Sequence, residues 1–230
     1  MLEKFEVYFN EINEWNNIIN LISFKDDTDL IYRHFCDSLY SAKVIIDIIE
    51  QHYYHHNTWG FKVADIGTGV GMPGIPVKII LSNIKLTLIE SIKKKCEFLK
   101  NMKTRLGLDI TILNERAEDI GQNKIHRQQY DFVLSRAVSN FSSNLEFAIP
   151  LLKINGFFII HKTKQLAENN ENGVPSISNA MKKLKIKLEQ KIFYNLPGRE
   201  LDYCILIFKK YENTPMQFPR KKGIPEKRPL

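Results

Sequence analysis

The sequence predicts an α/β protein with a mostly parallel sheet, and three observations support this prediction. From Gly60 onward, short apolar segments typical of strands alternate with amphipathic helical segments. The first of these strands ends in a glycine-rich turn, residues 67–74, which leads directly into a helix. Near the end of the chain, two strands are joined by a connection too short for a helical crossover, so this pair must be antiparallel.

The apolar pattern predicts seven strands and the helices around them. The strands are expected at residues 61–66, 85–90, 109–114, 131–135, 156–161, 190–195 and 203–209. Helices are expected at about residues 5–19, 26–50, 73–82, 91–106, 116–127, 141–152 and 176–187. A parallel sheet closed by an antiparallel C-terminal hairpin is the class I (Rossmann-like) methyltransferase arrangement. We expect an N-terminal helical extension at 1–58, the sheet domain at 59–212 and a basic, proline-containing tail at 213–230.

Composition excludes several classes of protein. The chain of 230 residues is 43% apolar, enough to fill a core, and suits one α/β domain with a short extension. We expect no membrane span, because no apolar run approaches the ~18 residues that one needs. The three cysteines are odd in number and widely spaced, which indicates reduced thiols in the cytoplasm.

The positive charge is concentrated in the last fifth of the chain. Residues 182–230 carry 13 Lys and Arg against 5 Asp and Glu, a local charge of +8 compared with +7 for the whole chain. Scattered lysines often mark only a solvated surface. The tail 218–230 is more specific, because its prolines oppose a helix and leave five cations on an extended arm that could follow a phosphate backbone.

The glycine-rich turn has the chemistry of a nucleotide-cofactor loop. Glycines let the backbone turn tightly and approach a ligand where a side chain would collide. The loop satisfies the dinucleotide fingerprint G-x-G-x-x-G, and Glu90 closes the next strand at the position of a ribose-binding acid. Asp65, however, precedes the first glycine with no other obvious partner, and an acid there repels a pyrophosphate. S-adenosylmethionine carries an ammonium and a sulfonium, so Asp65 favours this cofactor over a dinucleotide.

Polar residues follow each of the next strands, where ligands bind in open α/β sheets. They are Arg116 to Glu118, Ser135 and Arg136, and His161 and Lys162. The Asn/Asp-Pro-Pro-aromatic box of many exocyclic-amine methyltransferases is absent after the fourth strand. Guanine N7 offers a lone pair and no proton, so its methylation needs alignment but no general base.

His52, His55 and His56 have no further ligand at metal spacing, and we expect no metal site.

The sequence resembles the bacterial 16S rRNA guanine-N7 methyltransferase family RsmG, also called GidB. The resemblance runs from the first helix to the last residue. Four internal motifs carry it: Arg33-His-Phe-Cys-Asp-Ser-Leu39, Asp65-Ile-Gly-Thr-Gly-Val-Gly-Met-Pro-Gly-Ile-Pro76, Arg116-Ala-Glu118 and Ser135-Arg-Ala-Val138. The tail from Phe218 to Leu230 matches as well.

The resemblance implies S-adenosylmethionine as the cofactor and a guanine in the decoding-region loop of 16S rRNA as the target. It implies cofactor contacts at Gly67, Met72, Ala117, Glu118 and Arg136, with Glu118 at the adenine edge. Chemistry adds Asp65, Gly69 and Gly71 on the methionine side and Glu90 on the ribose. Arg136 is the candidate catalytic residue, aligning substrate and cofactor. The resemblance implies that the protein works in the cytoplasm. The sequence does not decide whether the substrate is naked rRNA, an assembly intermediate or the whole small ribosomal subunit, and we expect a monomer.

Candidate RNA contacts come from three places in the chain: Arg33, His34, Asp37 and Ser38 on the second helix, Lys162, and Arg220, Lys221 and Lys222 in the tail. On an α-helix Arg33 and Asp37 are i,i+4, as are His34 and Ser38, and the patch could equally be a structural hydrogen-bond cluster. The tail could instead pack back on the domain. Thr163 stands where the family often has Gly, and if that Gly lets RNA approach closely, the threonine changes the local geometry of the substrate site.

Two other functions compete with methyl transfer. One is a nicotinamide-dependent oxidoreductase that uses the same glycine loop, but the chain lacks a Tyr-x-x-x-Lys pair after the fourth strand and a second domain. The other is a non-catalytic RNA-binding module, which only the basic C-terminal fifth supports.

Overall fold

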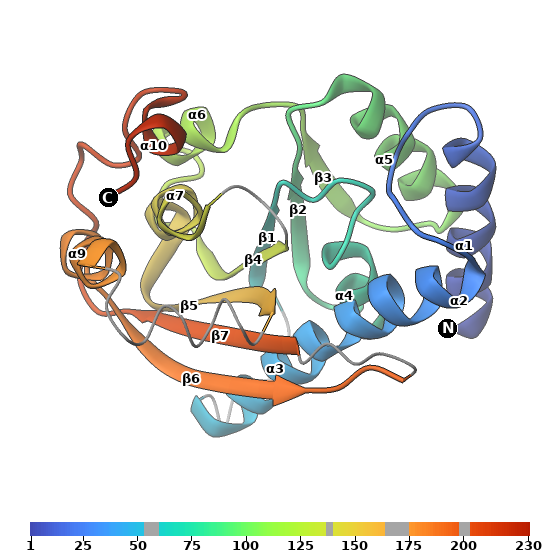
Figure 1. Cartoon of the computed structure of the whole chain (residues 1–230), viewed down its shortest axis with the longest axis horizontal. Coiled ribbons are helices and arrows are strands. Elements are labelled where there is room, and N and C mark those ends of the chain that lie inside the picture. Colours follow the sequence, from blue (N-terminus) through green and yellow to red (C-terminus); the bar gives the residue numbers. More distant parts are fainter. Residues whose placement is uncertain (53–59, 137–139, 164–174, 198–202) are drawn as a thin grey trace. The chain divides into compact units, whose positions relative to one another are not determined.

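The computed structural model describes residues 1–52, 60–136, 140–163, 175–197 and 203–230, which form two compact units, Met1–Asn114 and Glu115–Leu230. Each unit contains part of the alternating pattern (Figure 1). The described residues contain seven strands, close to the predicted positions. The division of the chain at residues 58 and 212 stays a prediction.

The first unit is a three-stranded parallel sheet with helices around it. The strands β1 (Lys62–Ile66), β2 (Lys85–Ile89) and β3 (Ile110–Leu113) lie in the order β3-β2-β1. Their residues are almost entirely buried in β1 and β2, as expected of a parallel sheet covered on both faces. The helices are α1 (Leu2–Asn16), α2 (Asp27–Asp29), α3 (Asp37–His52), α4 (Gly74–Ile80) and α5 (Lys93–Arg105).

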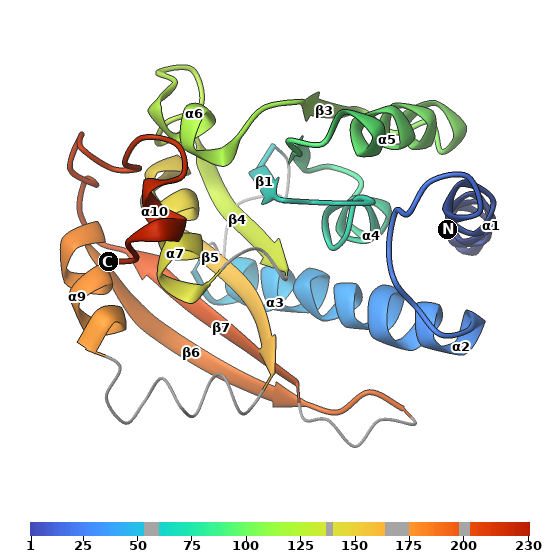
Figure 2. The ribbon, with the colours of Figure 1, turned by 45° about the horizontal axis from the view of Figure 1, so that its top comes forward.

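The N-terminal helix is bound to α5 by charge and by aromatic packing. Glu11 is buried and accepts hydrogen bonds from Arg105 Nε at 2.8 Å and from Asn101. The Trp15 ring packs edge-on against Phe98, with 5.6 Å between ring centroids. Because Phe98 is fully buried, this contact makes α1 part of the core of the first unit (Figure 2).

The second predicted helix is not one regular α-helix. Between α2 and α3, residues Leu30–Cys36 form a π-helix, which takes i to i+5 hydrogen bonds. This winding changes which side chains lie above one another within these seven residues, whereas Ser38 Oγ still donates to the carbonyl oxygen of His34, four residues before it. A π-helix of this length has no sequence signature that helical periodicity could detect.

The second unit extends a parallel pair with an antiparallel hairpin. Its strands β4 (Tyr130–Arg136), β5 (Leu152–Thr163), β6 (Ile186–Tyr194) and β7 (Tyr203–Lys210) lie in the order β4-β5-β7-β6. The β4–β5 pair is parallel, and β7 is antiparallel to both β5 and β6. The predicted α/β class with an antiparallel C-terminal hairpin is therefore confirmed.

The helices of the second unit are shorter than predicted. They are α6 (Ala117–Gln122), α7 (Phe141–Ala148), the 3-10 turn η2 (Ile149–Leu151), α9 (Pro175–Leu184) and α10 (Ile224–Lys227). Lys185 has φ +65°, which ends α9 and lets β6 start four residues earlier than predicted. Both α9 and α10 pack against α7 (Figures 1 and 2). No helix in the described ranges is long and apolar enough to span a membrane.

Lys210, the last residue of β7, is a fully buried lysine. Its Nζ donates hydrogen bonds to the carbonyl oxygens of Leu152 at 2.8 Å and of Ile149 at 3.1 Å. Burial, together with the smaller effect of the nearby Arg127 charge, lowers the pKa of Lys210 to about 7.

We expect Lys210 to make the stability of the fold depend on pH. Its folded pKa lies below the value of about 10.4 in an unfolded chain, so the unfolded state binds more protons between these values. The free energy of unfolding should therefore rise with pH across this window, by about 2 kcal/mol between pH 7 and pH 9. Urea titrations should give a flatter pH dependence for Lys210→Met, whereas Lys182→Met, at an exposed position, should follow the wild type. Equal slopes in all three proteins would contradict this expectation.

Candidate functional site

The glycine loop after β1 is organised around the buried carboxylate of Asp65. Asp65 Oδ2 accepts a hydrogen bond from Thr68 Oγ1 at 2.6 Å and from the Gly74 backbone N–H at 2.8 Å. The Asp65 side chain is fully buried. The expectation that Asp65 has no partner but a ligand is therefore wrong, because its carboxylate ties the start of the loop to the start of α4.

Two glycines of the loop are required by close contacts. A Cβ on Gly74 would lie 2.8 Å from Asp65 Oδ2, and one on Gly71 would lie 2.4 Å from the Ile75 side chain. Gly71 also has φ +99°, a conformation that L residues rarely adopt. Gly67 and Gly69 both have φ +61°. The buried Met72 side chain completes the loop.

Glu90 joins the glycine loop to the loop that follows β2. Its Oε2 accepts a hydrogen bond from the Gly69 backbone N–H at 2.9 Å, and its Oε1 accepts one from the Ile92 N–H at 2.8 Å. The Glu90 carbonyl accepts from Asn114 Nδ2 at 3.0 Å, which holds the residue from the β3 side. Each carboxylate oxygen retains a second lone pair, so Glu90 can still accept hydroxyl donors of a ligand.

These contacts give the loop a negative local character. The carboxylates of Asp65 and Glu90 both bind backbone N–H groups of the glycine loop. Such a loop fits a cationic ligand better than the pyrophosphate of a dinucleotide. The N–H groups of Gly69 and Gly74 are already bonded to carboxylates, and these carboxylates repel a phosphate. The residues present therefore fit the ammonium end of S-adenosylmethionine.

Two residues at this loop were missed by sequence reasoning. The Tyr8 hydroxyl, fully buried, donates to the Val70 carbonyl at 2.6 Å and so fastens α1 to the loop. Lys95 Nζ lies 4.0 Å from the position that a Cβ on Gly69 would occupy. The lysine run 93–95 is visible in the sequence, but nothing local indicates that its last member reaches the loop.

The polar patch of the second helix is mostly internal. His34, Asp37 and Ser38 are buried, and Ser38 Oγ donates to the His34 carbonyl. Arg33 Nη1 lies 3.9 Å from Asp29 Oδ2, on the N-terminal side, where an acid four residues before an arginine is the more favourable order. Of the four, Arg33 alone has an exposed side chain, 49% accessible. The placement favours a structural cluster, and RNA contact stays a prediction.

In the second unit Glu118 is bound to the tail. Glu118 lies in the first turn of α6 beside Ala117, and its buried side chain accepts a hydrogen bond from the Gly223 N–H at 3.1 Å. The predicted roles of Ala117 and Glu118 at the adenine of a cofactor stay predictions. The sequence offered no sign that Glu118 would contact residue 223.

Arg136 and Lys162 lie at the carboxyl ends of two paired strands. Arg136 ends β4 and is in register with His161 of β5, the residue before Lys162. Lys162 Nζ lies 5.4 Å from the centroid of the Phe141 ring, and burial lowers its pKa. The structure thus brings these two predicted residues to one end of the β4–β5 pair. Ala137 and Val138 of the same motif lie outside the described residues.

The predicted extended tail is wrong. Phe218 and Leu230 are buried, and residues 224–227 form the helical turn α10. Pro225 stands in the first turn of α10, where a helix tolerates proline because the N–H it lacks would have no intrahelical partner. The tail therefore packs on the second unit, as the alternative interpretation proposed.

Charged side chains fasten the tail. Arg220 binds Glu146, whose side chain is fully buried, through its Nη2 at 2.6 Å, its Nε at 2.9 Å and its backbone N–H at 2.7 Å. Arg127, also buried, donates to four carbonyls, among them those of Phe218 at 2.6 Å and Thr214 at 2.9 Å. Lys221 and Lys222 remain exposed. Of the three predicted tail contacts to RNA, Arg220 is thus engaged within the protein.

Metal ligation finds no support within the described ranges. No group of three or more His, Cys, Asp or Glu side chains there could hold an ion. His55 and His56 lie outside the described residues, so the histidine-rich segment is not tested.

Comparison with known proteins identifies the family. Residues 1–192 match the family model GidB, described as rRNA small subunit methyltransferase G. The chain is 35% identical over 229 residues to the ribosomal RNA small subunit methyltransferase G of Oceanobacillus iheyensis, covering 99% of this chain and 90% of the relative. It is 36% identical over 225 residues to that of Alkaliphilus oremlandii, covering 97% and 88%.

Solved structures agree on the fold. A putative sarcosine dimethylglycine methyltransferase from Galdieria sulphuraria gives a TM-score of 0.55 at 10% identity, covering 75% of this chain and 86% of that one. The structure of M. jannaschii TYW2 in complex with AdoMet gives 0.52 at 14% identity, covering 72% and 75%. At these identities the likeness shows the methyltransferase fold alone. By sequence, over almost its whole length, this chain belongs to the GidB family of rRNA small subunit methyltransferase G proteins.

Proposed function

We propose that the chain transfers a methyl group from S-adenosylmethionine to N7 of a guanine in 16S rRNA. The single observation that carries the cofactor assignment is the joint anchoring of the glycine loop by Asp65 and Glu90. When bound, S-adenosylmethionine supplies an electrophilic methyl group on a sulfonium. In this proposal Asp65 fixes the shape of the loop and favours a cationic ligand. Glu90 accepts hydrogen bonds from the ribose hydroxyls through its remaining lone pairs. The turn 67–72 forms the floor of the cofactor site.

Methylation at guanine N7 does not require a general base in the active site. Guanine N7 is an acceptor with an in-plane lone pair and no proton, so the protein must only exclude water and align the nucleophile with the methyl group. Arg136 has the planar donor geometry to stack on a base or to bind a phosphate in a bidentate way. The proposed contacts to the RNA backbone are Lys162, Lys221 and Lys222. The substrate is rRNA or a precursor of the small subunit, and the protein acts on it in the cytoplasm as a monomer.

The proposal is tested by binding and transfer measurements on the purified protein. Calorimetry should show micromolar binding of S-adenosylmethionine and none of NAD. Labelled methyl should then appear in 16S rRNA from a strain that lacks this modification, and mapping should place it on N7 of one guanine. Binding of RNA without any methyl transfer would favour the non-catalytic RNA-binding module, and binding of NAD would favour the oxidoreductase.

Substitution of Arg136 should impair turnover more than cofactor binding. We expect Arg136→Ala to lower kcat/KM by about 100-fold or more, because alignment of reacting groups contributes several kcal/mol. Arg136→Lys should recover little, since an ammonium cannot reproduce a planar fork. Single-turnover methyl transfer measures this directly. Full activity of Arg136→Lys would count against the planar role and leave only a point charge.

A further inference from the structure

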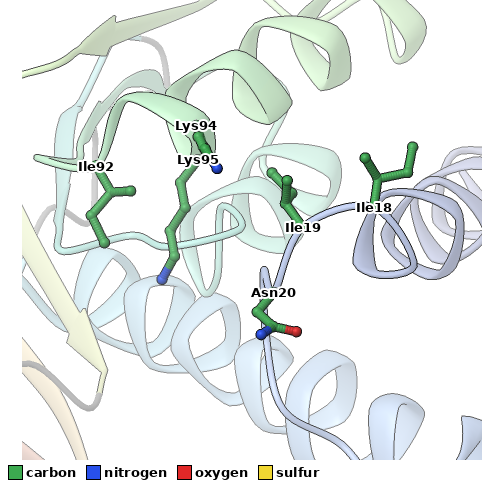
Figure 3. A pocket seen from close by; sticks show the side chains of 6 residues that line it. All are labelled: Ile18, Ile19, Asn20, Ile92, Lys94 and Lys95. Carbon is green, nitrogen blue, oxygen red and sulfur yellow. The ribbon is translucent and has the colours of Figure 1, made fainter.

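The first unit contains a pocket of about 400 Å³, and one of its lining residues, Lys95, reaches the glycine loop. Its walls come from two segments, the connector after α1 and the start of α5. The lining residues are Ile18, Ile19, Asn20, Ile92, Lys94 and Lys95. Figure 3 shows Lys95 extending between Ile92 on one side and Ile19 and Asn20 on the other.

The walls of this pocket are held in place by contacts outside it. Asn16 Oδ1 accepts hydrogen bonds from the backbone N–H groups of Leu21 at 2.9 Å and Ile22 at 3.1 Å, which shape the connector. The Ile92 N–H is bound by Glu90, so the other wall is fixed to the glycine loop. The pocket is thus a preformed feature of the fold, as small-ligand sites usually are.

The lining combines exposed apolar side chains with two cations. Ile18 is 77% exposed and Ile92 is 50% exposed, although both are large hydrophobic residues. Apolar side chains that remain accessible beside lysines suit a ligand with a flat apolar part and an anionic part. A nucleotide has both, since its base can lie against apolar side chains and its phosphate can meet the ammonium groups.

The charge of the lining distinguishes between two candidate ligands, S-adenosylmethionine and a nucleotide of RNA. S-adenosylmethionine carries a sulfonium and an ammonium against one carboxylate, so two lysines do not favour it. An RNA nucleotide carries a full negative charge on its phosphate. We propose that this pocket binds one nucleotide of the RNA substrate next to the cofactor loop, with Ile18 and Ile92 against the base and Lys94 and Lys95 at the phosphate. This inference rests on the proposed function and adds to it a substrate subsite in the N-terminal unit.

The test compares RNA binding with cofactor binding in matched variants. The pocket variants are Lys94→Gln and Ile18→Ser, because Lys95 also reaches the cofactor loop and its substitution would not separate the two sites. The controls are Lys93→Gln, an exposed lysine in the same helical turn that does not line the pocket, and Ile125→Ser, at a position 76% exposed in the second unit. The probe is unmodified 16S rRNA, titrated over a range of salt concentrations, and S-adenosylmethionine is titrated separately by calorimetry.

We expect Lys94→Gln to bind RNA about threefold more weakly at low salt. Its log–log salt slope should be flatter by about 0.7 for each single-strand phosphate that a lysine no longer neutralises. Ile18→Ser should weaken RNA binding with the slope unchanged, since it removes only apolar packing. Both variants should bind S-adenosylmethionine within about twofold of the wild type, and both controls should match it throughout.

Two results overturn the inference. The first is an RNA affinity and salt slope of Lys94→Gln equal to those of Lys93→Gln. The second is a weakened S-adenosylmethionine affinity in Lys94→Gln, whatever its RNA affinity, which would assign the pocket to the cofactor. A wild-type protein that neither binds S-adenosylmethionine nor transfers methyl overturns the proposed function itself. A wild-type protein that methylates RNA, with pocket variants that bind RNA as tightly, overturns only the pocket.

Discussion

Arg220→Ala is expected to lower the free energy of unfolding by about 3–5 kcal/mol. The substitution leaves the Glu146 carboxylate buried without the guanidinium that donates to both of its oxygens. An uncompensated buried charge costs far more than an exposed ion pair contributes, because water cannot replace the missing donor. The tail would also lose one of its anchors. Chemical denaturation monitored by circular dichroism measures the change.

The neighbouring lysine provides the control. Lys222→Ala removes one cation from the same segment at an exposed position, so its unfolding curve should match that of the wild type within about 0.5 kcal/mol. Arg220→Lys should lie between the two, since a single ammonium cannot donate in a bidentate way. If Arg220→Ala is as stable as Lys222→Ala, the buried ion pair does not hold the tail.

Asp65→Ala should abolish binding of S-adenosylmethionine and also destabilise the cofactor-free protein. Removing the carboxylate leaves the Gly74 N–H and the Thr68 hydroxyl without their acceptor in a buried place, at a cost of about 1–3 kcal/mol for each group. The loop is then without the hydrogen bonds that define its shape. The sequence shows no other obvious partner for Asp65, and the two hydrogen bonds are the reason why its removal should also lower the stability of the protein.

A conservative substitution separates the shape of the loop from its charge. Asp65→Asn can keep an acceptor toward Gly74 and Thr68 while removing the negative charge, so it should recover most of the stability but little of the cofactor affinity. Asp109→Ala, an exposed acid in the same unit, should leave both quantities unchanged. Thermal melting and calorimetry on the same samples give both readings. Retained affinity in Asp65→Ala would remove Asp65 from the cofactor site.

Periodicity located the sheet well and the irregular helices poorly. The strand β2 was predicted at 85–90 and lies at Lys85–Ile89, because an apolar run between turn residues is a local signal. The π-helix Leu30–Cys36 carries the same apolar spacing as an α-helix, so no local pattern distinguishes the two windings. The strand β5 begins at Leu152, directly after the 3-10 turn Ile149–Leu151, where the sequence predicted the end of a helix.

The site divides in the same way. Asp65, the glycines and Glu90 stand out in the sequence because a carboxylate, a turn and a second acid recur at short, fixed distances along the chain. The roles of Lys95 and Tyr8 could not be predicted, since Tyr8 reaches Val70 across 62 positions of the sequence. The positions of His34 and Asp37 could not be predicted either. Histidine and aspartate occur both at the surface and in the interior, and only the folded structure shows that these two are buried.

The amino-acid sequence by itself determined the α/β class, the glycine loop and the family, because each depends on residues close together along the chain. The tertiary structure alone decided that the buried Asp65 carboxylate holds the glycine loop through hydrogen bonds from Thr68 and Gly74. It also decided that the basic tail packs on the second unit. The tail contacts join residues 74 positions apart at Glu146 and 105 positions apart at Glu118. A buried carboxylate is excluded from water and must therefore be hydrogen-bonded by a donor of the protein. Which donor this is depends on the residues that the folded chain brings next to it.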